Sequence, residues 1–268
     1  MIPGGVQRPA LRGARWFTLL VARRHRPVGP CLVLAPHADD ETLGCGGTIA
    51  AMRAAGLAVT VAIATDGVGS DRLGRHPEVV AQVRRAEALD AARVLGVAED
   101  DVVFMDLPDG GLTERLDDLT NAVQGLIDEM QPAQILVCSP IDQHPDHAAL
   151  HRACAAADHR QAVVLEYLVW AWPGWPVSAL TASKAGGASV LELFREFAAL
   201  LRRLRRSNIE RHRAAKRSAM ASYQSQIGDG SAGRGIPARM FDEFDGRYEL
   251  LVEPTRSCRD AKRGRTPE

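Results

Sequence analysis

Apolar residues in the first 160 positions fall into short runs that alternate with longer amphipathic segments. The short runs are rich in Val, Ile, Leu and Ala, and they predict buried strands at 31–35, 57–65, 101–107 and 134–139. The longer segments carry apolar residues at helical spacing and predict helices at 42–55, 77–96, 115–130 and from about 145 onward. Because alternating strands and helices are typical of βαβ units, we expect an α/β fold: a Rossmann-like, mainly parallel sheet flanked by helices in a three-layer sandwich.

The pattern changes after residue 160. Residues 162–172 predict another strand, and residues 172–189 carry Pro, Gly and Ser in the pattern of a loop. Residues 188–206 fit neither pattern, and residues 209–226 predict a helix. We expect this C-terminal third to fold onto the same sheet. The predicted limits are an N-terminal extension at 1–28, one domain at 29–253 and a disordered tail at 254–268.

The charge balance gives no global field that would attract nucleic acid or an anionic membrane. The chain of 268 residues carries 33 basic and 33 acidic side chains, for a net charge of zero. The arginine-rich stretch at 202–217 is interpreted as a solvated basic face or a patch for an anionic partner. The apolar run at 16–22 is too short to cross a bilayer, which takes about 20 residues. We therefore predict a short packed helix there, with no membrane span and no signal peptide.

The number and spacing of the cysteines indicate in which cellular compartment the protein is expected. The five cysteines are odd in number and contain no CxxC pair, which predicts no disulfide framework. We expect a reducing, cytoplasmic location and cysteines that act as small buried apolar residues.

Two clusters of acids and histidines follow predicted strands. The first, in PHADDE at 36–41, comes directly after the strand at 31–35. The second, in DQHPDHAALH at 142–151, follows the strand at 134–139. Ligands of parallel α/β sheets bind at the carboxyl ends of the strands, so both clusters can face one crevice. Their members are His37, Asp39, Asp40 and Glu41, and Asp142, His144, Asp146, His147 and His151.

The first cluster places three carboxylates side by side, and their mutual repulsion indicates a bound cation. Histidine and aspartate together suit Zn²⁺, and Fe²⁺ or Co²⁺ fits the same ligands. A catalytic metal needs three protein ligands and an open position. His37, Asp40 and one histidine of the second cluster would supply that set.

The remaining members of the clusters suit proton transfer. Asp39 would stay free beside the metal as the general base. His144 could donate a hydrogen bond or a proton to the oxyanion or the leaving group. Asp142 or Asp146 could orient the ring of His144, as carboxylates behind a ligand histidine do.

Structural interpretations compete with some of these roles. Glu41 lies where acids favour a helix N-terminus, and we assign it that role. His147 and His151 are four residues apart and could bind a metal from one helix face, but the glutamate of the HExxH signature is absent. The glycines of GCGG at 44–47 do not predict a phosphate loop, because acids come first after the strand. The other histidines are predicted to lie on the surface: His25, His76, His159 and His212.

With both clusters in view, the chain resembles the LmbE-like/PIG-L family of zinc-dependent de-N-acetylases. PHADDE matches the family's PHxDDE signature, HPDH at 144–147 matches its second motif, and the resemblance covers residues 31–157. KRSAMASYQSQ at 216–226 is a weaker match. The resemblance implies a single-domain Rossmann-like fold that removes an N-acetyl group from a glucosamine-type sugar. It implies these roles: zinc binding by His37, Asp40 and His147, the base at Asp39, and assistance to the oxyanion and leaving amine by His144.

The resemblance also implies two substrate contacts. Arg84, in RRAE, matches the family's substrate-binding arginine, and Asp109, in LPDGGL, matches an aspartate after the third strand. The alternatives are an exposed i,i+3 pair of Arg84 with Glu87 and a turn role for Asp109. The chain departs from the family pattern at Ala38, where Pro is more usual, and at Tyr223, where many relatives carry His.

We therefore expect a metal-dependent hydrolase that deacetylates an N-acetylglucosaminyl small molecule or glycoconjugate. Two alternatives stay open. One is a metal-dependent amidase for another substrate class, and the other is a non-catalytic, Rossmann-like sugar-binding module. The expected partner is a small N-acetyl amino sugar or glycoconjugate and not nucleic acid, and a homo-oligomer is compatible with the sequence.

Overall fold

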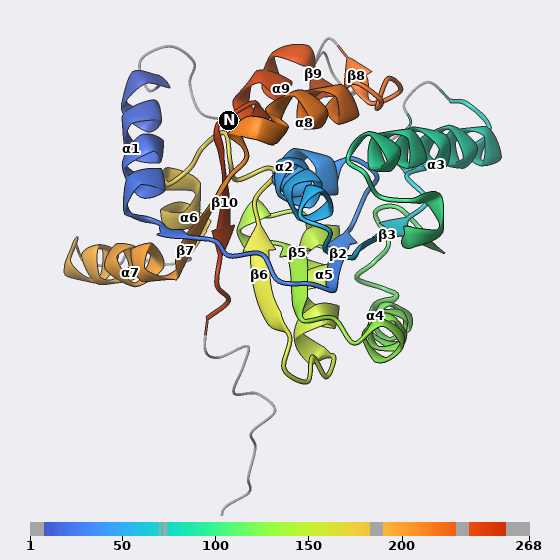
Figure 1. Cartoon of the computed structure of the whole chain (residues 1–268), viewed down its shortest axis with the longest axis horizontal. Helices are drawn as coiled ribbons and strands as arrows, with labels where there is room; N and C mark the ends of the chain where they lie inside the picture. The colour runs from blue at the N-terminus through green and yellow to red at the C-terminus, as the bar shows by residue number, and fades with distance from the viewer. Residues whose placement is uncertain (1–7, 70, 72–73, 183–189, 229–235, 256–268) are drawn as a thin grey trace, which may run out of the picture.

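The computed structural model describes residues 8–69, 71, 74–182, 190–228 and 236–255. Within these residues, eight strands form one sheet in the order β1-β7-β10-β6-β5-β2-β3-β4 (Figure 1). The strands of this sheet are β1 (Arg23–Arg24), β2 (Cys31–Ala35), β3 (Val59–Thr65), β4 (Val102–Leu107), β5 (Gln134–Cys138), β6 (Val163–Tyr167), β7 (Leu204–Asn208) and β10 (Tyr248–Val252). A separate small pair consists of β8 (Ile227–Gly228) and β9 (Ile236–Pro237).

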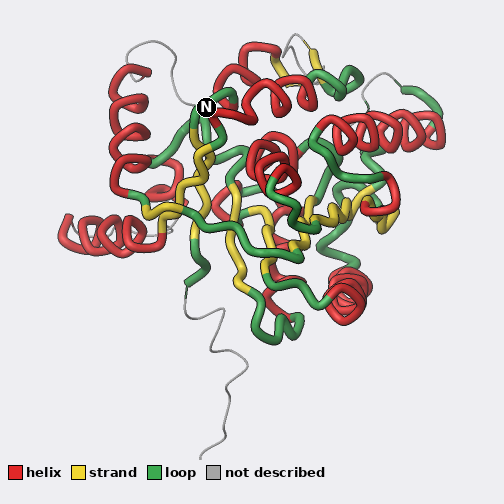
Figure 2. The backbone as a smooth tube through the Cα atoms, in the orientation of Figure 1, coloured by secondary structure: helices red, strands yellow, loops and turns green. Residues whose placement is uncertain are grey.

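Helices flank the sheet on both sides (Figure 2). They are α1 (Arg8–Val21), α2 (Asp40–Ala54), α3 (Pro77–Val94), α4 (Leu116–Met130), α5 (Pro145–Ala156), α6 (Val177–Ala182), α7 (Val190–Arg203), α8 (Arg213–Met220) and α9 (Ala238–Phe244). Short 3₁₀ turns lie at 99–101, 140–142 and 210–212. The expected α/β architecture of layered helices and a mainly parallel sheet is confirmed.

β2 lies at the switch point of the sheet. It pairs in parallel with β3 on one side and with β5 on the other, and the parallel order continues to β4 and β6. Right-handed crossovers from such an order put α2 and α3 on one face and α4 and α5 on the other. α8 packs against α2 and α3, and α4 packs against α5 (Figure 1). The carboxyl ends of β2 and β5 are therefore neighbours, and each is followed by one of the two clusters.

The C-terminal third joins this sheet, as expected. β10 lies between β6 and β7 and runs antiparallel to both. The segment at 188–206, which fits neither pattern in the sequence, contains α7 and the start of β7. The predicted disordered tail lies almost entirely outside the described residues, as do residues 183–189 of the predicted loop.

Three predicted elements in this third are wrong in part. The strand expected at 162–172 ends at Tyr167, because the backbone N–H groups of Val169 and Ala171 donate to Asp142 instead of a neighbouring strand. The loop expected at 172–189 contains α6. The helix expected at 209–226 is a 3₁₀ turn followed by α8, which ends at Met220 so that the next residues turn toward α2.

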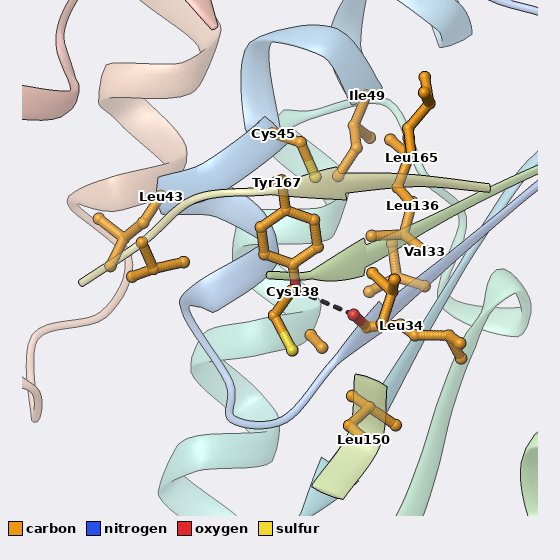
Figure 3. Close-up of a cluster of buried hydrophobic side chains, with 14 of the residues drawn as sticks. Val33, Leu34, Leu43, Cys45, Ile49, Leu136, Cys138, Leu150, Leu165 and Tyr167 are labelled. Carbon is orange, nitrogen blue, oxygen red and sulfur yellow. Dashed lines mark hydrogen bonds between the residues drawn. The ribbon is translucent and has the colours of Figure 1, made fainter. Parts of the chain in front are cut away.

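Close packing explains the glycines that follow the first cluster. A Cβ on Gly44 would lie 2.2 Å from the ring of Tyr167, and a Cβ on Gly47 would lie 2.5 Å from Ile209. The Tyr167 ring sits against α2 in the core, and its hydroxyl donates to the carbonyl of Leu34 over 2.9 Å (Figure 3). These glycines let α2 approach β6 and the 209–212 turn closely.

Two further expectations concern the cysteines and the membrane. Four cysteines are free and buried, at Cys31, Cys45, Cys138 and Cys154, as predicted; Cys258 lies outside the described residues. Among the described helices, none has both the length and the apolar character needed to cross a bilayer.

Candidate metal centre

The turn after β2 folds the first cluster back on itself. The backbone N–H of His37 donates to Asp40 Oδ2 over 3.2 Å, and the backbone N–H of Leu43 donates to the Asp39 carbonyl over 2.8 Å. Asp39 has a φ of 132°, in a region that non-glycine residues rarely adopt. Such a conformation costs about 1–3 kcal/mol and persists only where surrounding contacts hold it.

Two imidazoles converge on the carboxylate of Asp40. His37 Nδ1 lies 3.0 Å from Asp40 Oδ2, and His147 Nε2 lies 3.2 Å from the same oxygen. Burial raises the pKa of Asp40, but His147 and His37 lower it well below its usual range. Two ligands on a tetrahedral metal with bonds of about 2.0–2.1 Å lie about 3.3 Å apart. The separations around Asp40 are therefore close to those of ligands that share one metal ion.

His147 gives the clearest sign of a cation. Its Nδ1 lies 2.9 Å from Asp142 Oδ2. The same oxygen accepts the backbone N–H of Val169, two residues after the end of β6. Because a carboxylate only accepts, Nδ1 carries the proton, and in neutral histidine Nε2 then presents a lone pair. That Nε2 is buried, lacks a hydrogen-bond partner and faces Asp40 Oδ2. Burial lowers the pKa of His147, but Asp40 and Asp142 raise it to about 9, so the site favours a positive charge between the two groups.

His37 is held from its far side by two carboxylates. Its Nε2 lies 3.1 Å from Asp146 Oδ2 and 3.2 Å from Asp109 Oδ1. Asp146 is itself fixed by the backbone N–H groups of Gly110 and Leu112, at 2.8 Å and 3.2 Å. The structure differs here from the expectation that Asp142 or Asp146 orients His144: Asp142 holds His147, and Asp146 holds His37 instead.

His144 lies beside these rings as the residue that precedes α5. Its ring centroid is 5.0 Å from those of both His37 and His147. Its Nδ1 accepts the backbone N–H of Asp146 over 3.3 Å, so in neutral His144 the proton is on Nε2. Burial, with help from His37 and His147, lowers the pKa of His144. The ring is therefore a neutral donor at neutral pH.

Among the described residues, two sets of three side chains bring their ligand atoms close enough together to hold a metal, and neither set contains Asp40. His37, His144 and His147 offer ligand atoms within 4.8 Å of one another, and so do His37, Asp109 and Asp146. In the second grouping Asp146 already accepts two backbone N–H groups, which suits a carboxylate that orients a ligand histidine.

Asp39 is buried beside the centre. Its burial raises the pKa of the Asp39 carboxyl well above the usual range, and the neighbouring Asp40 and Glu41 add to that effect. Arg84 opposes it and is itself buried, at 6% exposed. The alternative of an exposed Arg84–Glu87 pair is therefore wrong. Glu87 instead accepts the backbone N–H and the hydroxyl of Ser225, both over 2.6 Å.

Residues from the end of the weaker motif hold the turn around Asp39. Glu41, assigned only a helix-start role from the sequence, is buried and accepts the backbone N–H of Asp39 over 3.1 Å. The buried hydroxyl of Tyr223 donates to Glu41 Oε1, and Gln226 Nε2 donates to the carbonyl of Ala38. Tyr223 therefore contacts the turn through Glu41.

A buried ion pair that the sequence analysis missed supports α2. The helix is broken at Cys45, which has a φ of −143°. Lys216 Nζ donates to the Leu43 carbonyl before the break and to Glu249 Oε1, both over 2.7 Å. Glu249 in turn accepts the backbone N–H groups of Gly47 and Thr48 after the break, at 2.8 Å and 2.7 Å. The pair thus satisfies backbone groups on both sides of the break. Its signal in the sequence is the single acid in the apolar strand YELLV.

Two other histidines have structural partners. His25, predicted to be exposed, is buried and lies 3.1 Å from the Gln134 side-chain amide, so that prediction is wrong. His151 Nε2 lies 3.0 Å from Glu166 Oε1, so its ring is engaged away from the candidate centre. The HExxH-like pairing of His147 with His151 is therefore not formed.

Comparisons with known proteins match the segment that carries both clusters. Residues 32–157 match the family model "PIG-L: GlcNAc-PI de-N-acetylase". Over 135 residues the chain is 32% identical to "Probable N-acetyl-alpha-D-glucosaminyl L-malate deacetylase 2" of Bacillus cereus. That match covers 48% of this chain and 60% of the relative, so it spans less than two thirds of the relative's length.

Solved structures share the fold. The zinc-inhibited form of teicoplanin deacetylase Orf2 superposes with a TM-score of 0.61 at 20% identity, over 83% of this chain and 96% of that one. GalB, the 4-carboxy-2-hydroxymuconate hydratase from Pseudomonas putida KT2440, superposes with a TM-score of 0.52 at 14% identity, over 83% and 93%. The fold alone thus accommodates more than one kind of reaction. The match of residues 32–157, the segment that carries both clusters, to the PIG-L family model is more specific than the shared fold.

Proposed function

We propose that this chain is a metal-dependent hydrolase that removes the N-acetyl group from an N-acetylglucosaminyl-containing small molecule or glycoconjugate. The observation that carries the proposal is the buried Nε2 of His147, which makes no hydrogen bond and lies 3.2 Å from Asp40 Oδ2. The family description and the name of the Bacillus relative support the substrate class.

His37, Asp40 and His147 would hold the metal in this proposal. Nitrogen and carboxylate ligands favour Zn²⁺, and Fe²⁺ or Co²⁺ fits the same set. A divalent metal bound there would polarise the acetyl carbonyl and lower the pKa of a water molecule toward about 7. Asp142 would keep Nδ1 of His147 protonated, so that Nε2 faces the metal.

Asp39 and His144 would move the protons. Asp39 takes a proton from the attacking water, and its burial suits it to hold that proton. His144 presents an Nε2–H that would donate a hydrogen bond to the oxyanion and to the departing amine, and the amine would take up the proton that Asp39 removed from the water. Arg84 and Asp109 would bind hydroxyl groups of the sugar next to these two residues. In this proposal, residues 29–253 form the single catalytic domain.

The alternative is a metal-dependent amidase for another substrate class, because the hydratase GalB shows that the fold by itself does not fix the reaction. The test pairs metal content with acetate release from N-acetylglucosaminides of varied aglycone and from N-acetyl amides that lack the sugar. One bound metal with chelator-sensitive release from the glucosaminides alone is the expected result. Release from amides without the sugar would favour the amidase. Absence of both metal and release would contradict the proposal and favour a binding module.

A further inference from the structure

The N-terminal helix α1 turns its apolar residues outward. Trp16, Phe17, Leu20 and Val21 are 65%, 45%, 53% and 41% exposed, and we refer to these four residues as the α1 surface. Contiguous exposed apolar patches are uncommon on monomeric proteins and mark interaction sites. The described residues around α1 leave this surface uncovered, at the edge of the molecule beside β7 (Figure 1).

Specific contacts on the opposite side fix this orientation. Thr18 is fully buried and accepts the indole N–H of Trp175 over 3.0 Å. Arg15 pairs with Glu243 over 2.7 Å and donates to the carbonyl of Pro173 over 2.9 Å. A surface helix normally buries its apolar stripe. Because Leu19 packs against the core and Thr18 and Arg15 make hydrogen bonds on that side, the outward position of the aromatic residues belongs to the fold.

The segment of the chain that contains α1 carries only basic charges, of which Arg15 is paired with Glu243 from α9. Residues 1–38 contain arginines at 8, 12, 15, 23, 24 and 26 and no aspartate or glutamate. Arg23, Arg24 and Arg26 follow α1 directly and are exposed. The neutral net charge of the whole chain therefore conceals a local basic segment, to which an anionic surface would be attracted at short range.

We propose that the α1 surface docks on an anionic membrane surface, with the helix lying in the headgroup layer. Aromatic and aliphatic residues beside arginines are the composition of helices that lie in the membrane interface. At 14 residues α1 is too short to span a bilayer. A symmetric contact between two copies would place the same arginine-bearing segment against itself, which like charges oppose.

The experiment measures co-sedimentation of the whole chain with vesicles of phosphatidylcholine, with and without phosphatidylglycerol. We expect binding to the anionic vesicles that weakens as salt is raised. Phe17→Glu should reduce binding at least tenfold, and so should the double variant Arg23→Ser/Arg24→Ser. Val79→Glu is the matched control, because Val79 is 48% exposed on α3 and should leave binding unchanged.

Three outcomes would overturn the proposal. The first is no association with vesicles, and the second is equal binding to vesicles with and without the anionic lipid. The third is a dimer in equilibrium sedimentation that Phe17→Glu dissociates, which would assign the α1 surface to a second copy of the chain. Circular dichroism of each variant separates lost docking from lost folding.

Discussion

The turn after β2 and the C-terminal residues 216–249 meet around the same few atoms, yet they contribute in opposite ways. The turn supplies His37, Asp39 and Asp40, three of the chemical groups of the candidate centre. The described residues of this stretch supply none of the three proposed ligands, but they bond to the turn and to both sides of the break in α2. The comparison teaches that one short turn supplies three of the groups of the candidate centre, whereas the contacts that hold this turn come from far along the chain.

The two regions also differ in how their polar groups are arranged. Asp39 has a strained backbone and a buried carboxyl with a raised pKa, as is common at active sites. Lys216 and Glu249, in contrast, bond fully to each other and to backbone groups. Strain is thus concentrated in the turn, and satisfied hydrogen bonds are concentrated behind it.

The largest effect is expected from removing the proposed base. Asp39→Ala should lower kcat by about 10²–10⁴-fold, the usual contribution of a positioned general base. Metal content should stay unchanged, because Asp39 is not among the three proposed ligands. Acetate release and metal analysis on the same preparation measure both, with Asp90→Ala, an exposed acid of α3, as the control. Full turnover in Asp39→Ala would refute the role.

The next effect tests the supporting region. Lys216→Met leaves the Glu249 charge buried without its partner, so we expect a loss of about 3–5 kcal/mol in the free energy of unfolding. The double variant Lys216→Met/Glu249→Gln should recover part of that loss, because it also removes the charge. Urea unfolding followed by circular dichroism measures both. A single variant as stable as the wild type would contradict the structural role of the pair.

A smaller effect links the two regions. Tyr223→Phe removes only the hydroxyl that donates to Glu41. Losing this hydrogen bond should cost about 1–2 kcal/mol of the free energy that holds the turn around Asp39. If that cost appears in the activation barrier, kcat falls roughly five- to thirty-fold. KM and metal content should change less, since Tyr223 does not face the ligands. Tyr248→Phe on β10 is the matched control. If both variants have wild-type kcat, Tyr223 does not position Asp39.

The smallest effect comes from an exposed ion pair. Arg85 and Asp106 lie 2.6 Å apart, with side chains 44% and 61% exposed. Arg85→Ala should change the free energy of unfolding by less than about 1 kcal/mol, because solvent screens such pairs. The same urea titration tests this value against that of Lys216→Met. If Arg85→Ala lowered the free energy of unfolding as much as Lys216→Met does, burial would not explain why the two ion pairs differ.

The N-terminal strands, their helices and both clusters could be predicted from sequence, because hydrophobic periodicity and motif spacing are local signals. Other features could not. β6 ends early because Asp142, on a different loop, captures the N–H groups of Val169 and Ala171. His25 is buried because Gln134 lies opposite it in the fold. The residues near Asp142 in the sequence do not include Val169 or Ala171, and those near His25 do not include Gln134.

The sequence by itself determined the alternation of strands and helices and the placement of each cluster after a strand, since both follow from residue types a few positions apart. Only the tertiary structure decided that Asp142 holds His147, that Asp146 holds His37, and that Glu249 bridges the break in α2. The physical reason is that a buried polar group must find its partner wherever the fold brings one within hydrogen-bond distance, however far away that partner is in the chain.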